Sequence, residues 1–254
     1  MRRPRHGASA TDVDVLSVKG VSKSFDGFLA VNRVSFNVAA GEILGLIGPN
    51  GSGKSTTFNL IAGTLRPSAG SIAFENQEIA GSPAYRICRK GLARTFQIPR
   101  PFRRLGLREN VTLAAFYGGR GVASRAEAET HAVAALDLVG LPNDADAMID
   151  GLGAAQLKKL ELARALATRP KLLLADESLG GLDHAEMERA ADMLGRIRRD
   201  LGITIVWVEH IMGVLMRVVD RVIVLDHGEV IFAGLPRDAA KDSRVAEVYL
   251  GRSR

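Results

Sequence analysis

The residues best placed to do chemistry lie between Gly48 and Ser55, where a glycine-rich turn follows an apolar run and opens into a helix. Gly48, four intervening residues, and then Gly53, Lys54 and Ser55 match the pattern of a phosphate-binding loop. Glycines let backbone N–H groups close around phosphate oxygens that a Cβ would keep at a distance. Lys54 supplies a charge for the outer phosphates, and Ser55 offers a hydroxyl to Mg²⁺. The segment predicts a polyphosphate site with its metal; the alternative is an ordinary glycine turn.

Two carboxylates, Asp176 and Glu177, end a second apolar run, KLLLADES. In a chain that has a phosphate-binding loop, such a strand end is where metal and water must be organised. We expect Asp176 to reach the Mg²⁺ shell and Glu177 to polarise the water that attacks the γ-phosphate. The alternative is an acidic pair at the N-terminus of a helix.

Four further side chains are candidates because the same chain also has the phosphate-binding loop and the acidic strand end. Gln97 ends a predicted strand, where its amide could bind Mg²⁺ or the attacking water, and His210 follows a buried strand at 203–208, at the edge where parallel sheets bind ligands. Phe25 lies on a predicted loop near the phosphate site and could stack on a base. Asp183, in a glycine-containing turn before a helix, is either a helix cap or a contact.

The elements that must position these residues follow from hydrophobic periodicity. Residues 43–47 are apolar throughout, as in a strand buried on both faces of a parallel sheet, and 56–61 continue as a helix. Two earlier strands predict an antiparallel edge near the nucleotide, and a hairpin closes the core after the last parallel strand. The predicted strands are residues 13–18, 31–38, 43–47, 71–75, 92–97, 171–178, 203–208, 221–225 and 229–233.

Residues 105–168 change in character and carry helical spacing. Helices are predicted at 111–116, 125–139 and 156–167, with Gly and Pro between them, so a helical lobe of about residues 98–168 is inserted into the α/β core. The small-residue turn at 151–155 could leave the N-terminus of the last helix open to an anion. We expect a disordered basic tail at 1–12, one core domain at 13–238, and a C-terminal tail at 239–254 with a short helix.

Length and composition exclude several classes of protein. A chain of 254 residues that is 46% hydrophobic can bury a full core. Its single cysteine, Cys88, excludes an internal disulfide framework, and no apolar run approaches the roughly 20 residues that span a bilayer. The net charge of +6 permits contact with nucleic acid or anionic lipid, but the arginines are scattered, which favours a solvated surface.

The order and spacing of these motifs resemble the ATP-binding subunit of an ABC transporter over about residues 13–251. GPNGSGKST resembles the phosphate loop of the family, and LLLADE resembles the strand that carries its metal-organising and catalytic acids. Phe25 resembles the adenine-stacking aromatic, Gln97 the Q-loop residue, Asp183 the D-loop residue and His210 the switch histidine. The resemblance implies a P-loop NTPase (RecA-like) core with an antiparallel β edge subdomain and an inserted helical subdomain.

The resemblance also implies a set of site residues for MgATP. Glu177, His210 and Gln97 would be catalytic, and Mg²⁺ would be held by Ser55, Gln97 and Asp176. The residues implied to bind ATP are Phe25, Gly48, Pro49, Asn50, Gly51, Ser52, Gly53, Lys54, Ser55, Thr56 and Asp176, joined across a dimer by Gly153, Ala154, Ala155, Gln156 and Asp183.

A narrower resemblance rests on ARTFQIPRPF, the ELARAL helix, EHIMGVLMRVVDRVIVLDHGEVIFAG and the terminal VAEVYLG. These segments are similar to the branched-chain amino-acid importer type, whose relatives also import urea, short amides and aromatic carboxylates. That type implies a second ABC ATPase subunit, two transmembrane permease subunits and, indirectly, a solute-binding protein, with no nucleic-acid partner. The chain would be cytoplasmic and peripheral on the inner face of the cell membrane, and would hydrolyse ATP to drive import.

Two departures from the family pattern keep other functions open. The signature, close to LSGGQ in the family, is LGAAQ at 152–156, and Ser178 replaces the proline that usually follows the catalytic Glu. The chain could therefore be a catalytically weak regulatory partner in an asymmetric ATPase pair, although Glu177 and His210 are intact. It could also be a soluble ABC ATPase that acts on ribosomes or DNA, but neither a second ATPase half nor a long coiled coil is present.

Overall fold

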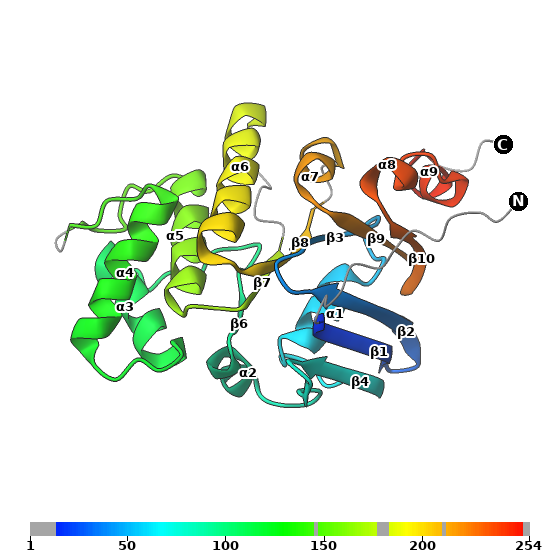
Figure 1. The fold of residues 1–254 in the computed structure, drawn as a ribbon, viewed down its shortest axis with the longest axis horizontal. Helices are drawn as coiled ribbons and strands as arrows, with labels where there is room; N and C mark the ends of the chain where they lie inside the picture. The colour runs from blue at the N-terminus through cyan, green and yellow to red at the C-terminus, as the bar shows by residue number, and fades with distance from the viewer. Residues whose placement is uncertain (1–13, 145–146, 177–182, 210–211, 251–254) are drawn as a thin grey trace, which may run out of the picture.

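The computed structural model describes residues 14–144, 147–176, 183–209 and 212–250. They form a parallel-type sheet flanked by helices, with a separate antiparallel sheet at one side and a group of helices at the other (Figure 1). The elements in chain order are β1 (Asp14–Phe25), β2 (Phe28–Ala39), β3 (Ile43–Ile47), α1 (Lys54–Ile61), β4 (Ala69–Phe74), β5 (Gln77–Glu78), α2 (Ala84–Lys90), β6 (Leu92–Arg94), α3 (Leu107–Gly118), α4 (Arg125–Val139), α5 (Ala154–Ala167), β7 (Leu172–Asp176), α6 (His184–Leu201), β8 (Thr204–Val208), α7 (Met212–Val218), β9 (Arg221–Asp226), β10 (Glu229–Gly234), α8 (Pro236–Ala239) and α9 (Ser243–Leu250).

The main sheet has the strand order β10-β9-β3-β8-β7-β6. Its pairs are parallel except for the β9–β10 hairpin. Every residue of β3, β7 and β8 is buried, which explains their unbroken apolar sequences. Since β3 and β7 both neighbour β8, the loop after β3 and the carboxylate that ends β7 lie at the same edge of the sheet.

The antiparallel sheet has the order β2-β1-β4-β5. β1 and β2 each contain 12 residues, longer than predicted, and are joined by the two-residue turn Asp26-Gly27. The prediction that Phe25 lies on a loop is wrong, because Phe25 ends β1 and pairs with Phe28 of β2. An Asp-Gly pair is a strong signal for a tight hairpin, so both strands extend to the turn.

The helical group α3, α4 and α5 lies between β6 and β7 in the sequence (Figure 1, green). Two predicted boundaries need correction. β6 ends at Arg94 and not at Gln97, because this edge strand has only β7 as a neighbour and the chain then turns into a proline-containing loop. α5 begins at Ala154 and not at Gln156, because Gly153 serves as its N-cap.

The core is divided by the main sheet. Ile43 and Ile47 of β3 join one cluster with α3 to α7, whereas Leu44 and Leu46 join a second with α1 and the antiparallel sheet. This alternation follows from the two-residue period of a strand. The strand that leads into the phosphate loop is thus fixed from both faces, and the predicted α/β fold class is confirmed. The domain boundaries stay a prediction. Among the described helices, none has the length and apolarity needed to cross a membrane.

Candidate active site

The predicted phosphate loop connects β3 to α1 and is strongly curved. Gly48, Gly51 and Gly53 have φ values of +150°, +81° and +99°, in the region that L side chains rarely adopt. A Cβ added to Gly48 would lie 2.1 Å from the carbonyl oxygen of Leu225 and 2.6 Å from Ser52 Oγ. Glycine at position 48 is therefore required by both the backbone angle and the space.

The loop is tied to neighbouring strands through the backbone. Gly228, in the β9–β10 turn, donates its N–H to the carbonyl of Ser52 at 3.0 Å, and its own carbonyl accepts from the N–H of Asn32 at 2.8 Å. The loop is thus tied to the β9–β10 hairpin, which is in turn tied to β2. A preorganised loop avoids the entropic cost of ordering itself around a ligand.

Lys54 folds back over the loop that precedes it. Its side chain is 5% exposed, and Nζ donates to the carbonyls of Gly48 at 2.7 Å and Pro49 at 2.8 Å. The positive end of α1 and the ammonium group point to the same place, which favours an anion. Ser55 is exposed in the first turn of α1, so its hydroxyl faces solvent beside this anion site.

A cleft of about 360 Å³ combines the loop with the β1–β2 hairpin. Phe25 and Phe28, 41% and 69% exposed, line it together with Ala30 and residues 50–56. Lys23 Nζ lies 5.0 Å from the centroid of the Phe25 ring. The structure thus brings Phe25 and the loop together as predicted. Phe28 was missed, although the Asp-Gly hairpin signal places it opposite Phe25.

Asp176, at the end of β7, is 4% exposed and paired with Arg94 of β6. Arg94 Nη2 lies 2.7 Å from Asp176 Oδ2, and Nη1 lies 2.6 Å from Asn59 Oδ1 of α1. Within the described residues, Oδ1 of Asp176 is buried without a hydrogen-bond partner. An orphaned carboxylate oxygen and the Ser55 hydroxyl are hard ligands of the type that Mg²⁺ takes, so the donor set fits that metal.

Arg94 was missed by the sequence analysis. Its signal was a lone arginine in the otherwise apolar strand Leu92–Arg94, next to an acid-ended strand. The guanidinium also lies over the rings of Phe58 and Phe96, at 5.8 and 5.1 Å from their centroids. Arg94 therefore connects the carboxylate of β7 both to α1 and to the chain that follows β6.

Of the remaining predicted residues, the structure describes Gln97 and Asp183 but not Glu177 and His210. Gln97 is exposed in the loop after β6, whereas Glu177 and His210 lie outside the described residues. Asp183 is the N-cap of α6: its Oδ1 accepts from the N–H of Glu186 at 2.7 Å, and Glu186 Oε2 accepts from the N–H of Asp183 at 3.0 Å. The cap that the sequence left open is confirmed, and a nucleotide contact by Asp183 stays a prediction.

The signature residues do not line the cleft that holds the phosphate loop. Gly153 has an extended backbone and precedes α5, and its N–H donates to Gln156 Oε1 at 3.1 Å. A Cβ at Gly153 would have only Gln156 Oε1 within 4 Å, at 3.9 Å, so a larger side chain fits there. Ala155 and Gln156 instead line a second cleft of about 1240 Å³.

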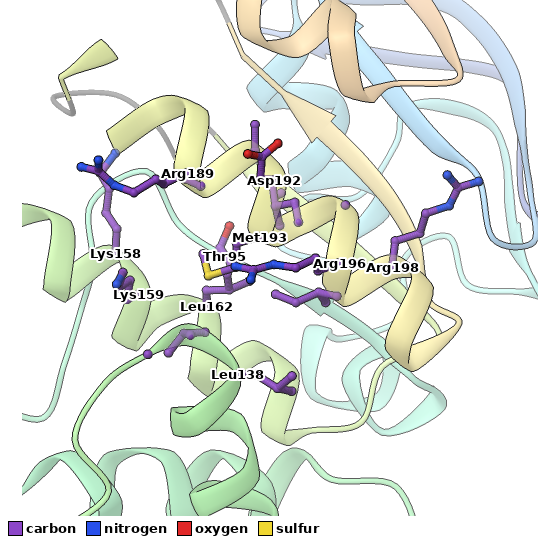
Figure 2. A pocket seen from close by; sticks show the side chains of 18 of the residues that line it. Thr95, Leu138, Lys158, Lys159, Leu162, Arg189, Asp192, Met193, Arg196 and Arg198 are labelled. Atoms are coloured by element: carbon purple, nitrogen blue, oxygen red, sulfur yellow. The ribbon is translucent and has the colours of Figure 1, made fainter. Parts of the chain in front are cut away.

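This larger cleft lies between α5 and α6. Lys158 and Lys159 of α5 and Arg189 and Arg196 of α6 line it (Figure 2). Thr95, which follows β6, also lines the cleft. The cleft is not lined by phosphate-loop residues, and it separates the first turns of α5 from the main sheet.

The C-terminal helix α9 reaches the phosphate loop. Burial raises the pKa of the Tyr249 phenol to about 12, and the nearby backbone N–H of Gly48 opposes part of that rise. Tyr249 packs against the same hydrophobic cluster as β3. The predicted C-terminal helix is therefore present and lies beside the loop.

We expect Gly48→Ala to lower the stability of the protein by about 3 kcal/mol or more, since a forbidden backbone angle and a backbone clash act together. Thermal unfolding would measure the loss. The matched control is Gly51→Ala: it also has a positive φ, but no atom lies within 4 Å of an added Cβ, so strain alone should cost about 1–2 kcal/mol. Equal losses for the two variants would contradict the assignment of the close contact at Gly48.

Comparison with known proteins identifies the family of the chain. The protein-family model described as ABC transporter matches residues 31–180 of this chain. The high-affinity branched-chain amino acid transport ATP-binding protein BraF of Pseudomonas aeruginosa is 33% identical over 251 residues, which cover 94% of this chain and 98% of BraF. Its counterpart LivG of Escherichia coli K12 is 34% identical over 251 residues, with the same coverage of both chains.

Solved structures agree with these relatives. An ATP-binding cassette of an ABC transporter in its ADP conformation superposes with a TM-score of 0.85 at 28% identity, covering 94% of this chain and all of the other. A dimeric cassette in a post-hydrolysis state, bound to ADP and Pi, gives a TM-score of 0.78 at 28% identity and covers 87% and 99%. With its phosphate loop, buried carboxylate and aromatic hairpin assembled as described, the chain belongs to the ABC transporter ATP-binding family and is an ATPase.

Proposed function

We propose that the chain is the ATP-hydrolysing subunit of an importer for branched-chain amino acids, or for other amino acids or related small polar solutes. The observation that carries this proposal is the similarity to BraF and LivG, which extends over 94% of the chain. The site described above supports it, because the phosphate loop and the aromatic hairpin line one cleft that would accept a nucleotide.

We assign the roles of the residues from the described site together with the family resemblance. Lys54 and the loop amides would bind the β- and γ-phosphates, while Phe25 and Phe28 would stack on the adenine. Ser55, Gln97 and Asp176 would hold Mg²⁺, which neutralises phosphate charge when bound. Glu177 would orient the attacking water as general base, and His210 would sense the γ-phosphate.

Assembly as a dimer would complete the site. The signature residues at 153–156 lie apart from the loop of their own chain, as two facing subunits require, and one similar cassette was solved as a dimer with ADP and Pi. We propose a sandwich of two ATPase subunits beneath two permease subunits on the inner face of the membrane. A solute-binding protein would deliver the solute, and closure on ATP would drive import.

The test is reconstitution with permease subunits of the branched-chain amino-acid importer type. We expect the chain to co-purify with them and its ATPase rate to rise when a binding protein is loaded with a branched-chain amino acid. Stimulation by another class of solute would reassign the cargo. Failure to associate with any membrane subunit would contradict the importer and favour a soluble ABC ATPase.

A second candidate, a catalytically weak partner in an asymmetric pair, is favoured by one observation: position 153 offers no hydroxyl and position 155 carries a methyl group. A hydrogen bond to a charged group is worth roughly 1.5–3 kcal/mol, so its loss would weaken closure on the partner's ATP by about 10- to 150-fold. The backbone amides and the dipole of α5 remain, so we expect ATP hydrolysis at that site to be reduced and not abolished.

We expect the triple change of Gly153, Ala154 and Ala155 to Ser-Gly-Gly to raise the turnover of the homodimer without changing the ATP affinity of the monomer. The room beside Gly153 accommodates the serine. Steady-state ATPase and calorimetry would measure the two quantities, and Ala154→Gly alone is the control because it adds no donor. An unchanged turnover would show that these residues do not face a γ-phosphate or that closure does not limit the rate.

A further inference from the structure

Glu161 and Arg164 form an ion pair on α5 that serves no role in the site described so far. Arg164 Nη1 lies 3.0 Å from Glu161 Oε2, one turn apart on the helix. The side chain of Glu161 is 7% exposed and that of Arg164 is 19% exposed, so water screens the pair only partly. A buried ion pair is costly to desolvate and needs further hydrogen bonds to be stable.

Those further partners come from the loop that carries Gln97. Arg164 Nη1 also donates to the carbonyl oxygen of Arg100 at 2.8 Å, and its guanidinium lies 5.2 Å from the centroid of the Phe102 ring. Burial raises the pKa of Glu161, and the charge of Arg164 together with the backbone N–H groups of Arg100 and Phe96 opposes that rise. The pair thus engages the loop on both sides of Gln97.

The Glu161–Arg164 pair is linked through the loop at 96–102 to the buried carboxylate of the site. Glu161 and Phe96 both line the cleft of about 1240 Å³ that separates α5 from α6. Phe96 in turn lies under the Arg94 guanidinium, which binds Asp176. A continuous set of contacts therefore runs from α5, through the loop at 96–102, to the buried carboxylate at the end of β7.

We propose that Glu161 and Arg164 are positioning residues: they clamp the loop at 96–102 to α5, so that Gln97 moves with the helix that carries the signature. The clamp fixes the backbone directly before Gln97 and three residues after it. The part that concerns Gln97 rests on the function proposed above, whereas the clamp itself does not.

The test uses the full-length protein with Glu161→Gln and Arg164→Lys. Glu161→Gln keeps the size of the side chain and removes its charge, and Arg164→Lys keeps the charge and removes the planar fork. Hydrogen exchange should speed up at the amides of Phe96 and Arg100 by roughly 10- to 100-fold in Glu161→Gln, as expected for losing a bond to a charged acceptor. Arg164→Lys should give a smaller increase.

A kinetic measurement separates positioning from simple support of the fold. For Glu161→Gln we expect kcat to fall roughly tenfold with the KM for ATP nearly unchanged, and the Mg²⁺ concentration for half-maximal ATPase to rise. The matched control is Glu109→Gln with Arg125→Lys, an exposed pair at 2.6 Å between α3 and α4 of the same helical group, which should change neither exchange nor kinetics.

Two results would overturn the proposal. Unchanged exchange at Phe96 and Arg100 in Glu161→Gln would show that no clamp exists, whether or not the protein hydrolyses ATP. Faster exchange with an unchanged kcat and Mg²⁺ requirement would show that the clamp does not position Gln97. A failure of the importer function would appear elsewhere, as loss of permease association with the exchange result intact.

Discussion

Replacing Lys54 with alanine is expected to abolish tight binding of MgATP. Lys54 Nζ lies against the Gly48 and Pro49 carbonyls, inside the curve of the loop where the phosphates would enter. Without it, the loop itself attracts the polyphosphate through its backbone N–H groups and the α1 dipole alone, and a charged pair with phosphate is among the stronger hydrogen-bonded contacts. We expect an affinity loss of at least about 100-fold by calorimetry.

The control for this variant is Lys23→Ala. Lys23 is a cation of the same nucleotide cleft region, but its Nζ lies over the Phe25 ring and not in the phosphate loop. Its removal should reduce affinity by less than about tenfold, the scale of an exposed cation–π contact. Unchanged affinity in Lys54→Ala, with both proteins folded, would refute the assignment of the phosphate loop.

Glu177→Gln is expected to keep the affinity for ATP while turnover falls by at least about two decades, the range for losing a positioned general base. Glu177 directly follows Asp176 in the sequence, and its role as general base is a prediction from that sequence position. Because binding without hydrolysis leaves ATP in place, this variant should also accumulate the ATP-bound dimer, which size-exclusion chromatography would detect.

Asp176→Asn provides the contrast. It changes a residue predicted to bind Mg²⁺, so nucleotide affinity should fall only when Mg²⁺ is present, and binding measured in EDTA should not change. If Glu177→Gln instead loses ATP affinity together with turnover, Glu177 is a binding residue and the general base lies elsewhere.

The features that the sequence predicted well are those fixed by local patterns. The glycines of the phosphate loop, the uniformly apolar strands β3, β7 and β8, and the cap at Asp183 each depend on residues a few positions apart. Their conformations follow from backbone angles, burial on two faces and helix capping. Hence the core of the site could be located without coordinates.

The features that were missed depend on pairs distant in the sequence. Arg94 and Asp176 are 82 residues apart, and only the pairing of β6 with β7 makes them neighbours. The loop partners of the Glu161–Arg164 pair similarly lie more than 60 residues earlier, in a loop whose path hydrophobic periodicity does not predict. Phe28 was missed for a different reason, since the Asp-Gly turn signal was present but not used.

The Arg94–Asp176 pair determines the charge environment that a metal ion would meet at Asp176. Asp176 is 4% exposed, and burying a carboxylate without a partner charge is costly. Arg94 supplies that partner charge in the absence of a metal ion. A Mg²⁺ ion bound at Oδ1, as proposed, would therefore join a carboxylate whose other oxygen is already paired with a guanidinium. We therefore expect the fold to be stable without Mg²⁺, because Arg94 partners the buried carboxylate whether or not the metal is bound.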